Sequence, residues 1–166
     1  MTPTNQPRSH RFELDFMRRT LTILREYQGP YDATILINCL LGLLIVPREV
    51  LINSIPLDAA SGLGDWGISP DSIQHFERVT HNNKNPETIR GVVRSLRNAV
   101  AHFTVWPVHR DHRVEGFKFE TNTGFAATLT LEELRAFVEK LASHIEQSFD
   151  KSSTTSLGEA RGFGKR

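Results

Sequence analysis

The chain has 166 residues, of which 39% are hydrophobic and 23% are charged, a composition typical of one soluble domain with a hydrophobic core. The formal net charge of +1 excludes a polybasic nucleic-acid binder, so any surface for nucleic acid must come from local clustering of cations. The lone cysteine, Cys39, excludes an intramolecular disulfide and a cysteine-rich zinc site.

The two ends of the sequence differ from the segment between them. The opening residues, MTPTNQPRSH, lack the apolar core of a signal peptide and predict a flexible arm over residues 1–10. The Ser- and Gly-rich residues 150–166 predict a disordered tail. The longest apolar run, residues 33–46, is shorter than the roughly 20 residues that a membrane span needs. We therefore expect a cytoplasmic protein without a membrane partner and a folded domain over residues 11–149.

The first two predicted helices differ in polarity. Residues 11–27 carry Phe and Leu among charges and predict an amphipathic helix. Residues 33–46 follow a good N-cap, Asp32, and precede Pro47, which ends a helix. Because this second helix is apolar on nearly all sides, we expect it at the centre of a bundle, with Cys39 buried there. Residues 48–68 give no clear assignment.

The remaining elements predict three helices and one hairpin. Ser69 and Pro70 predict the start of a third helix, and a fourth is expected over residues 86–103. Residues 113–130 alternate in polarity around the turn sequence NTG and predict a small β-hairpin. Thr130 and Glu133 form a capping box before a last helix over residues 131–149. The expected fold is an all-α bundle of about five helices with a hairpin insertion.

The fourth helix contains the stretch RSLRNAVAHF, residues 94–103. On a helical wheel, a core stripe of Ile89, Val92, Val93, Leu96, Val100 and Phe103 faces away from a polar arc. That arc holds Arg97, Asn98 and His102, with Arg90, Arg94, Ser95 and the small residues Gly91 and Ala101 among them. Such an arc allows close approach by RNA or by the same helix of a second copy. In a two-fold dimer each His102 approaches the partner's Arg97, so we expect a homodimer.

These residue types suit cleavage of RNA, whose 2′-OH is an internal nucleophile. Histidine serves as base or acid near neutral pH, and arginine stabilises charge on the phosphate. Asparagine can orient the histidine or the phosphate. The motif lacks the carboxylate cluster of a two-metal nuclease, so we expect no metal and no cofactor. Arginines 90, 94, 110 and 113 are candidate contacts to the RNA backbone.

The segment RNAVAH, residues 97–102, resembles the RNxxxH form of the Rx4–6H motif of HEPN domains. Residues 31–49 also resemble a helix of one plasmid- and genome-borne bacterial HEPN subgroup. The resemblance implies a dimeric helical bundle and a metal-independent endoribonuclease acting on single-stranded RNA in toxin–antitoxin or phage-defence systems, with an antitoxin as a possible partner. By position it assigns Arg97 to the scissile phosphate, His102 to acid–base chemistry and Asn98 to the polar place after the arginine.

Two alternatives remain open from the sequence. The first is a catalytically silent HEPN-like module that dimerises and binds RNA, a nucleotide or a partner protein. The second is a metal site on His109 and His112, which is weak because no third ligand lies nearby and no helix follows Pro107. A solvated loop over VHRDHR, residues 108–113, is the expected structure there.

Overall fold

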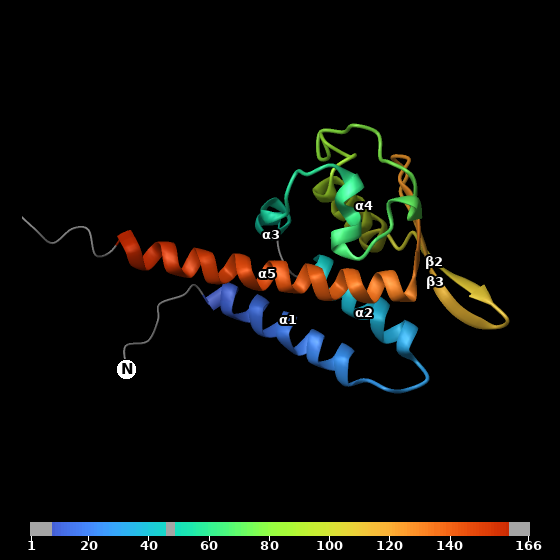
Figure 1. Ribbon diagram of the computed structural model, residues 1–166, viewed down its shortest axis with the longest axis horizontal. Helices are drawn as coiled ribbons and strands as arrows, with labels where there is room; N and C mark the ends of the chain where they lie inside the picture. Colours follow the sequence, from blue (N-terminus) through green and yellow to red (C-terminus); the bar gives the residue numbers. More distant parts are fainter. Residues whose placement is uncertain (1–7, 46–48, 160–166) are drawn as a thin grey trace, which may run out of the picture.

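The computed structural model describes residues 8–45 and 49–159. Figure 1 shows a long C-terminal helix, α5 (Leu131–Glu159), flanked on one side by α1 (Arg8–Glu26) and on the other by α4 (Ile89–Ala101). A β-hairpin projects beyond the helices at one end of the molecule (Figure 1). In the described ranges, no helix combines the length and the apolar character needed to cross a membrane.

The helical core is built around α2 (Asp32–Ile45), as its apolar sequence predicts. Leu36, Leu40 and Leu43 are at most 2% exposed, and Cys39 is buried beside them. This burial raises the pKa of the Cys39 thiol, with a smaller opposing effect of the Arg135 charge. Helices α1, α4 and α5 all contact α2, so its central position is confirmed.

The predicted all-α class is wrong, because a four-stranded antiparallel sheet lies beside the helices. The strand order is β1 (Ile73–His75), β4 (Ala126–Thr130), β3 (Arg113–Glu120) and β2 (Val105–Arg110). The predicted hairpin corresponds to β3 and β4, paired from Gly116↔Thr130 to Glu120↔Ala126. It is the middle of a sheet rather than an isolated insertion.

The helix predicted to start at Ser69 and Pro70 is also absent. These residues lead into a single 3-10 turn, η2 (Pro70–Ser72), followed by β1. The Ser69 side chain makes no cap, and its amide instead donates to the Glu133 carboxylate at 2.9 Å. The Ser72 hydroxyl donates to the same carboxylate at 2.6 Å. A tertiary contact with α5 therefore overrides the local start signal.

The other helix bounds refine the sequence predictions. Residues 48–68 contain a short helix, α3 (Glu49–Ser54), and a 3-10 helix, η1 (Ala60–Trp66). Helix α1 begins at Arg8, within the expected arm, and α5 continues to Glu159, well into the expected disordered tail. Residues 1–7 and 160–166 of the arm and tail lie outside the described residues.

The capping box at the start of α5 is confirmed. The Glu133 amide donates to the Thr130 hydroxyl at 3.1 Å, and the Thr130 amide donates to the Glu133 carboxylate at 2.9 Å. Burial raises the pKa of Glu133, but hydrogen bonds from Ser72, Thr130 and Ser69 outweigh it and lower that pKa overall. Glu133 thus ties the turn before β1 to the first turn of α5.

We expect Glu133→Gln to lower the free energy of unfolding by about 1 kcal/mol at neutral pH, since a charge-assisted acceptor is lost. Because the folded-state pKa is depressed, the stabilisation is present above the ordinary glutamate pKa of 4.5 and is lost as pH falls through the folded value. Denaturant unfolding at neutral and acidic pH measures this. Glu132→Gln is the control, because Glu132 is the neighbouring glutamate and is exposed. A difference between wild type and Glu133→Gln that does not shrink in acid contradicts this account.

Candidate active site on helix α4

Helix α4 presents one face to the core. Val92, Val93 and Leu96 are fully buried and Val100 is 4% exposed, so these four positions of the predicted stripe are confirmed. The helix begins where the Thr88 hydroxyl accepts a hydrogen bond from the Gly91 amide, at 3.1 Å. Its packing against α2 and β3 fixes the orientation of the residues on its other side.

The C-terminal end of α4 is held by a Schellman motif. The Thr104 amide donates to the Ala99 carbonyl at 2.9 Å, and the Phe103 amide donates to the Val100 carbonyl at 3.2 Å. His102 is the C-cap residue, and Phe103 takes the left-handed position that is usually glycine, with φ of 56°. The Thr104 hydroxyl bonds the Glu120 carbonyl at 2.5 Å, which anchors this end of α4 to β3.

This ending overturns the prediction that Phe103 belongs to the core stripe. The helix ends at Ala101, and the reversal of the backbone leaves the Phe103 side chain 84% exposed. Trp106, at the start of β2, is 46% exposed. Two large aromatic side chains therefore follow His102 closely in the sequence and lie at the surface.

The three motif residues lie outside the core face of α4. Arg97 and Asn98 are half-buried, whereas His102 is exposed. Arg97 and His102 are five residues apart, which separates them by about 140° around the helix and about 7.5 Å along it. The helix thus presents the arginine and the histidine in two different directions, with exposed Ala101 between them.

Two other residues of the predicted polar arc are not at the surface. A Cβ on Gly91 would lie 2.6 Å from the Pro86 carbonyl oxygen and would also clash with that of Asn85. Gly91 therefore accommodates the chain's own backbone, and neither RNA nor a second helix can approach there. Ser95 is fully buried beneath the same loop.

Ser95 belongs to a buried polar cluster that the sequence analysis did not find. Its hydroxyl donates to the Glu77 carboxylate at 3.0 Å, and the Asn83 side-chain amide donates to that carboxylate at 2.6 Å. Thr123, in the β3–β4 turn, also donates to Glu77. The members come from three separate segments without common spacing, so no sequence pattern marks them. The cluster fixes α4 against residues 77–83 and the sheet.

Arg90 and Arg94, predicted to bind RNA, also support the structure. Arg90 donates through Nε to the Ile55 carbonyl at 2.6 Å. Arg94 donates to the Asn82 carbonyl at 2.5 Å and to the Asn53 side chain at 2.7 Å. Both side chains line a cavity at the start of α4 rather than the surface beside His102.

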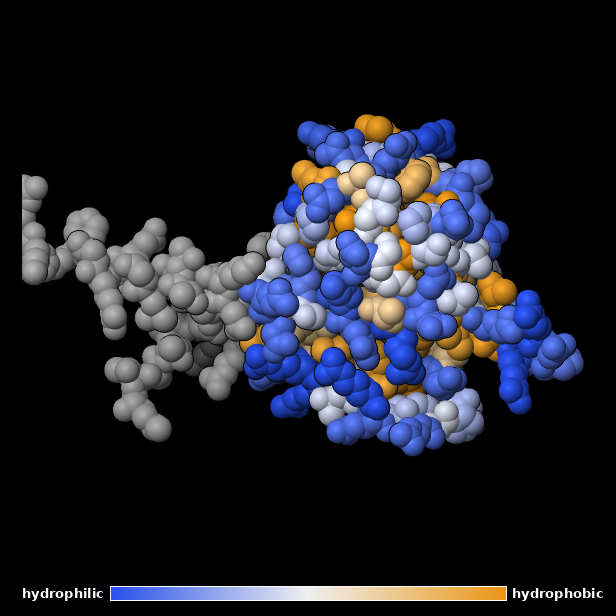
Figure 2. All heavy atoms as spheres, viewed as in Figure 1, coloured by the Kyte–Doolittle hydropathy of each residue, from blue (hydrophilic) through white to orange (hydrophobic). Residues whose placement is uncertain are grey.

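Arg110 and Arg113 lie at the tip of the projecting β2–β3 hairpin, not in the expected loop. Asp111 and His112 both have positive φ and form a two-residue turn of the I′ type. Hydrophilic residues cover the projecting end of the molecule (Figure 2). Strand β2 places Arg110 about 17 Å beyond Val105, so one protomer does not bring the hairpin tip to its own motif.

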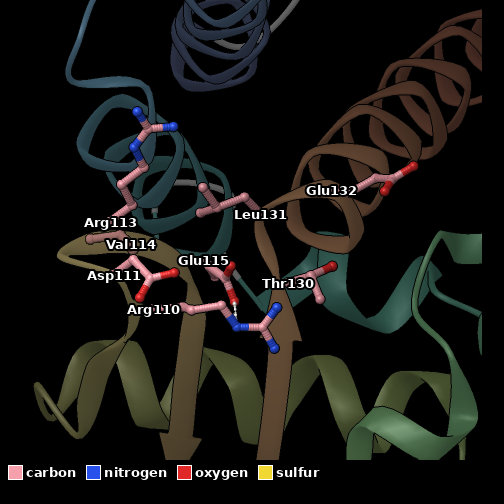
Figure 3. A pocket seen from close by; sticks show the side chains of 8 residues that line it. All are labelled: Arg110, Asp111, Arg113, Val114, Glu115, Thr130, Leu131 and Glu132. Carbon is pink, nitrogen blue, oxygen red and sulfur yellow. Dashed lines mark ion pairs between the residues drawn. The ribbon is translucent and has the colours of Figure 1, made fainter.

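The cavity beside the hairpin tip, of about 750 Å³, has mixed charge. Figure 3 shows Arg110 directed toward Glu115, with which it forms an ion pair at 3.4 Å, while Arg113 points away from both. Asp111 and Glu132 also line this cavity. Three carboxylates beside two guanidinium groups make it a poor site for phosphate, so an RNA contact by these arginines stays a prediction.

Comparison with models of protein families identifies the family of this chain. The family model described as HEPN pEK499 p136 matches residues 1–152. The protein belongs to the HEPN family. Neither the curated proteins nor the solved structures compared with it gave a match. Membership of the HEPN family indicates a nuclease or nucleotide-related function.

Metal-ligating side chains do not gather around the HEPN motif. Throughout residues 8–45 and 49–159, no group of three or more His, Cys, Asp or Glu is placed to hold a metal ion. His109 and His112, considered from the sequence, lie on β2 and in the turn that follows it. The groups available for chemistry on the exposed side of α4 are an imidazole, a guanidinium and an amide.

Proposed function

We propose that this HEPN protein is a metal-independent endoribonuclease that cleaves single-stranded RNA by attack of the 2′-OH. The observation that carries the proposal is the exposed His102 at the C-cap of α4, on the same helix as Arg97 and Asn98. The Schellman motif holds the His102 backbone rigidly and leaves its imidazole in solvent. A histidine placed in this way has no packing role in the protomer.

The proposed reaction assigns one step to each group. A His102 imidazole removes the 2′-OH proton as O2′ attacks the adjacent phosphorus. The bond from phosphorus to the 5′ oxygen breaks, and the imidazole that took up the 2′ proton supplies a proton to that oxygen. Arg97 stabilises the charge on the phosphate oxygens, and Asn98 orients the phosphate or the imidazole. The products are a 2′,3′-cyclic phosphate and a 5′-OH.

A homodimer is part of this proposal, since Arg97 and His102 leave α4 about 140° apart, and we propose that Arg97 of one protomer acts with His102 of its partner. A two-fold axis beside Ala101 brings the motif surfaces of two copies together. The exposed Phe103 and Trp106 are then covered, which offsets the cost of exposing them in the single protomer. Because a free ribonuclease damages its own cell, we include in the proposal a role as a toxin or phage-defence effector restrained by an antitoxin.

The test is cleavage of labelled single-stranded RNA by the purified protein in EDTA. We expect cleavage of RNA with 2′,3′-cyclic phosphate ends and no cleavage of the matched 2′-O-methyl strand. Cleavage of the 2′-O-methyl strand, or activity that EDTA removes, contradicts the proposed chemistry. Absence of cleavage by a protein that is dimeric in sedimentation favours the second candidate, a silent dimerisation module, which the exposed Phe103 and Trp106 also support.

A further inference from the structure

A cavity lined by basic side chains lies at the start of α4, away from His102. It has a volume of about 190 Å³, several times the roughly 30 Å³ that one water molecule occupies in the liquid. Its four basic side chains come from the 81–84 loop and from α4, and no carboxylate lines it. The lining residues used below are His81, Lys84, Arg90 and Arg94.

These four side chains keep donors for a ligand. Within the described part of the chain, His81 and Lys84 are exposed and have no recorded hydrogen bond or ion pair. An arginine has five N–H donors. Arg90 uses only Nε, on the Ile55 carbonyl, and Arg94 makes two hydrogen bonds, so both keep donors while their positions are fixed. Because the two arginine side chains are already held in place, little conformational entropy is lost when a ligand binds.

Backbone amides at the start of α4 do not give this cavity its positive character. The Ile89 amide donates to the Asp58 carbonyl at 2.9 Å, and the Gly91 amide donates to the Thr88 hydroxyl. The positive character therefore comes from side chains. Arginine binds phosphate through paired N–H groups and lysine through its point charge, so phosphate is the ligand that this set fits.

The cavity lies on the same side of α4 as Arg97 of the motif. Arg90, Arg94 and Arg97 are spaced i, i+4 and i+7, which places them on one face of the helix. The rise from Arg90 to Arg97 is about 10.5 Å. Resting on the proposed ribonuclease function, we propose that the His81–Lys84–Arg90–Arg94 cavity binds a backbone phosphate of the RNA substrate, away from the phosphate that is cleaved.

Binding is tested with Lys84→Ala, because this exposed lysine makes no hydrogen bond or ion pair with the described residues, so we expect its loss to leave the fold intact. Lys140→Ala, on the exposed side of α5, is the matched control. The probe is a fluorescent 2′-O-methyl strand, which binds without being cut. Its affinity is measured against salt by anisotropy. We expect the slope of log K against log salt to become shallower by about 0.7 for Lys84→Ala, the value for one phosphate on a single strand, and to stay unchanged for Lys140→Ala.

Cleavage gives a second readout. For a long RNA we expect Lys84→Ala to raise KM with kcat unchanged, whereas cleavage of a dinucleotide, which is too short to reach the cavity, stays as in wild type. Equal salt slopes for wild type and Lys84→Ala overturn the proposal, as does a mononucleotide that competes for the cavity better than the strand. Wild type that binds with the expected slope but cuts no RNA refutes the ribonuclease function and leaves the phosphate site standing.

Discussion

His102→Ala abolishes RNA cleavage, with an expected fall in rate of about 10²–10⁴-fold, the usual contribution of a general acid or base. The free energy of unfolding should change by no more than about 0.5 kcal/mol, because the side chain is exposed and the C-cap hydrogen bonds belong to the backbone. Single-turnover cleavage and thermal unfolding measure the two effects. This separation of activity from stability is what distinguishes a catalytic histidine from one that packs.

The matched control is His109→Ala, which removes an exposed histidine from β2. It should cut RNA at the wild-type rate. Cleavage by His102→Ala at that rate refutes the assignment of His102. Loss of cleavage together with dissociation of the dimer instead assigns His102 to the interface, in agreement with a silent dimerisation module.

Mixing two inactive variants tests whether the site is shared between protomers. If Arg97 of one protomer acts with His102 of its partner, a mixed dimer of Arg97→Ala and His102→Ala contains one intact site and one that lacks both groups. Random exchange of subunits then restores about one quarter of the wild-type activity. If each site lies within one protomer, the mixture stays inactive. The 140° separation of the two side chains on α4 favours restoration.

The sequence predicted the elements whose signals are local. The apolar length of α2, the core stripe of α4 and the Thr130–Glu133 capping box each depend on residues within one helix, and each is present. The motif itself is a short pattern on a single helix. Its position outside the core face therefore followed from helical periodicity alone.

The elements that were missed depend on distant partners. Strand β2 contains Pro107 and a bulge at Val108–His109, so its sequence lacks regular alternation and its pairing with β3 defines it. Strand β1 has three residues and exists through β4. Phe103 fits the helical period, but the helix ends before it, and periodicity does not locate a Schellman motif.

For Gly91, the helical wheel and the structure predict different effects of a substitution by alanine. From the wheel, it is a small residue that admits RNA or a second helix, so Gly91→Ala should impair cleavage or dimerisation while leaving the fold intact. In the structure, the added Cβ meets the Asn85 and Pro86 carbonyl oxygens of the protein itself. We therefore expect Gly91→Ala to lower the free energy of unfolding by about 2–3 kcal/mol, since the contact is with backbone that cannot rotate away.

Gly64→Ala is the control, because an added Cβ there has no neighbour within 4 Å. Denaturant unfolding of both variants measures the difference. A stable Gly91→Ala protein with weakened dimerisation would restore the original interpretation of the polar arc. Loss of stability would instead show that the open surface of α4 is confined to its C-terminal half. The reaction then depends on Arg97, Asn98 and His102 alone, and the N-terminal half of the helix contributes to RNA binding only through the side chains of its cationic cavity.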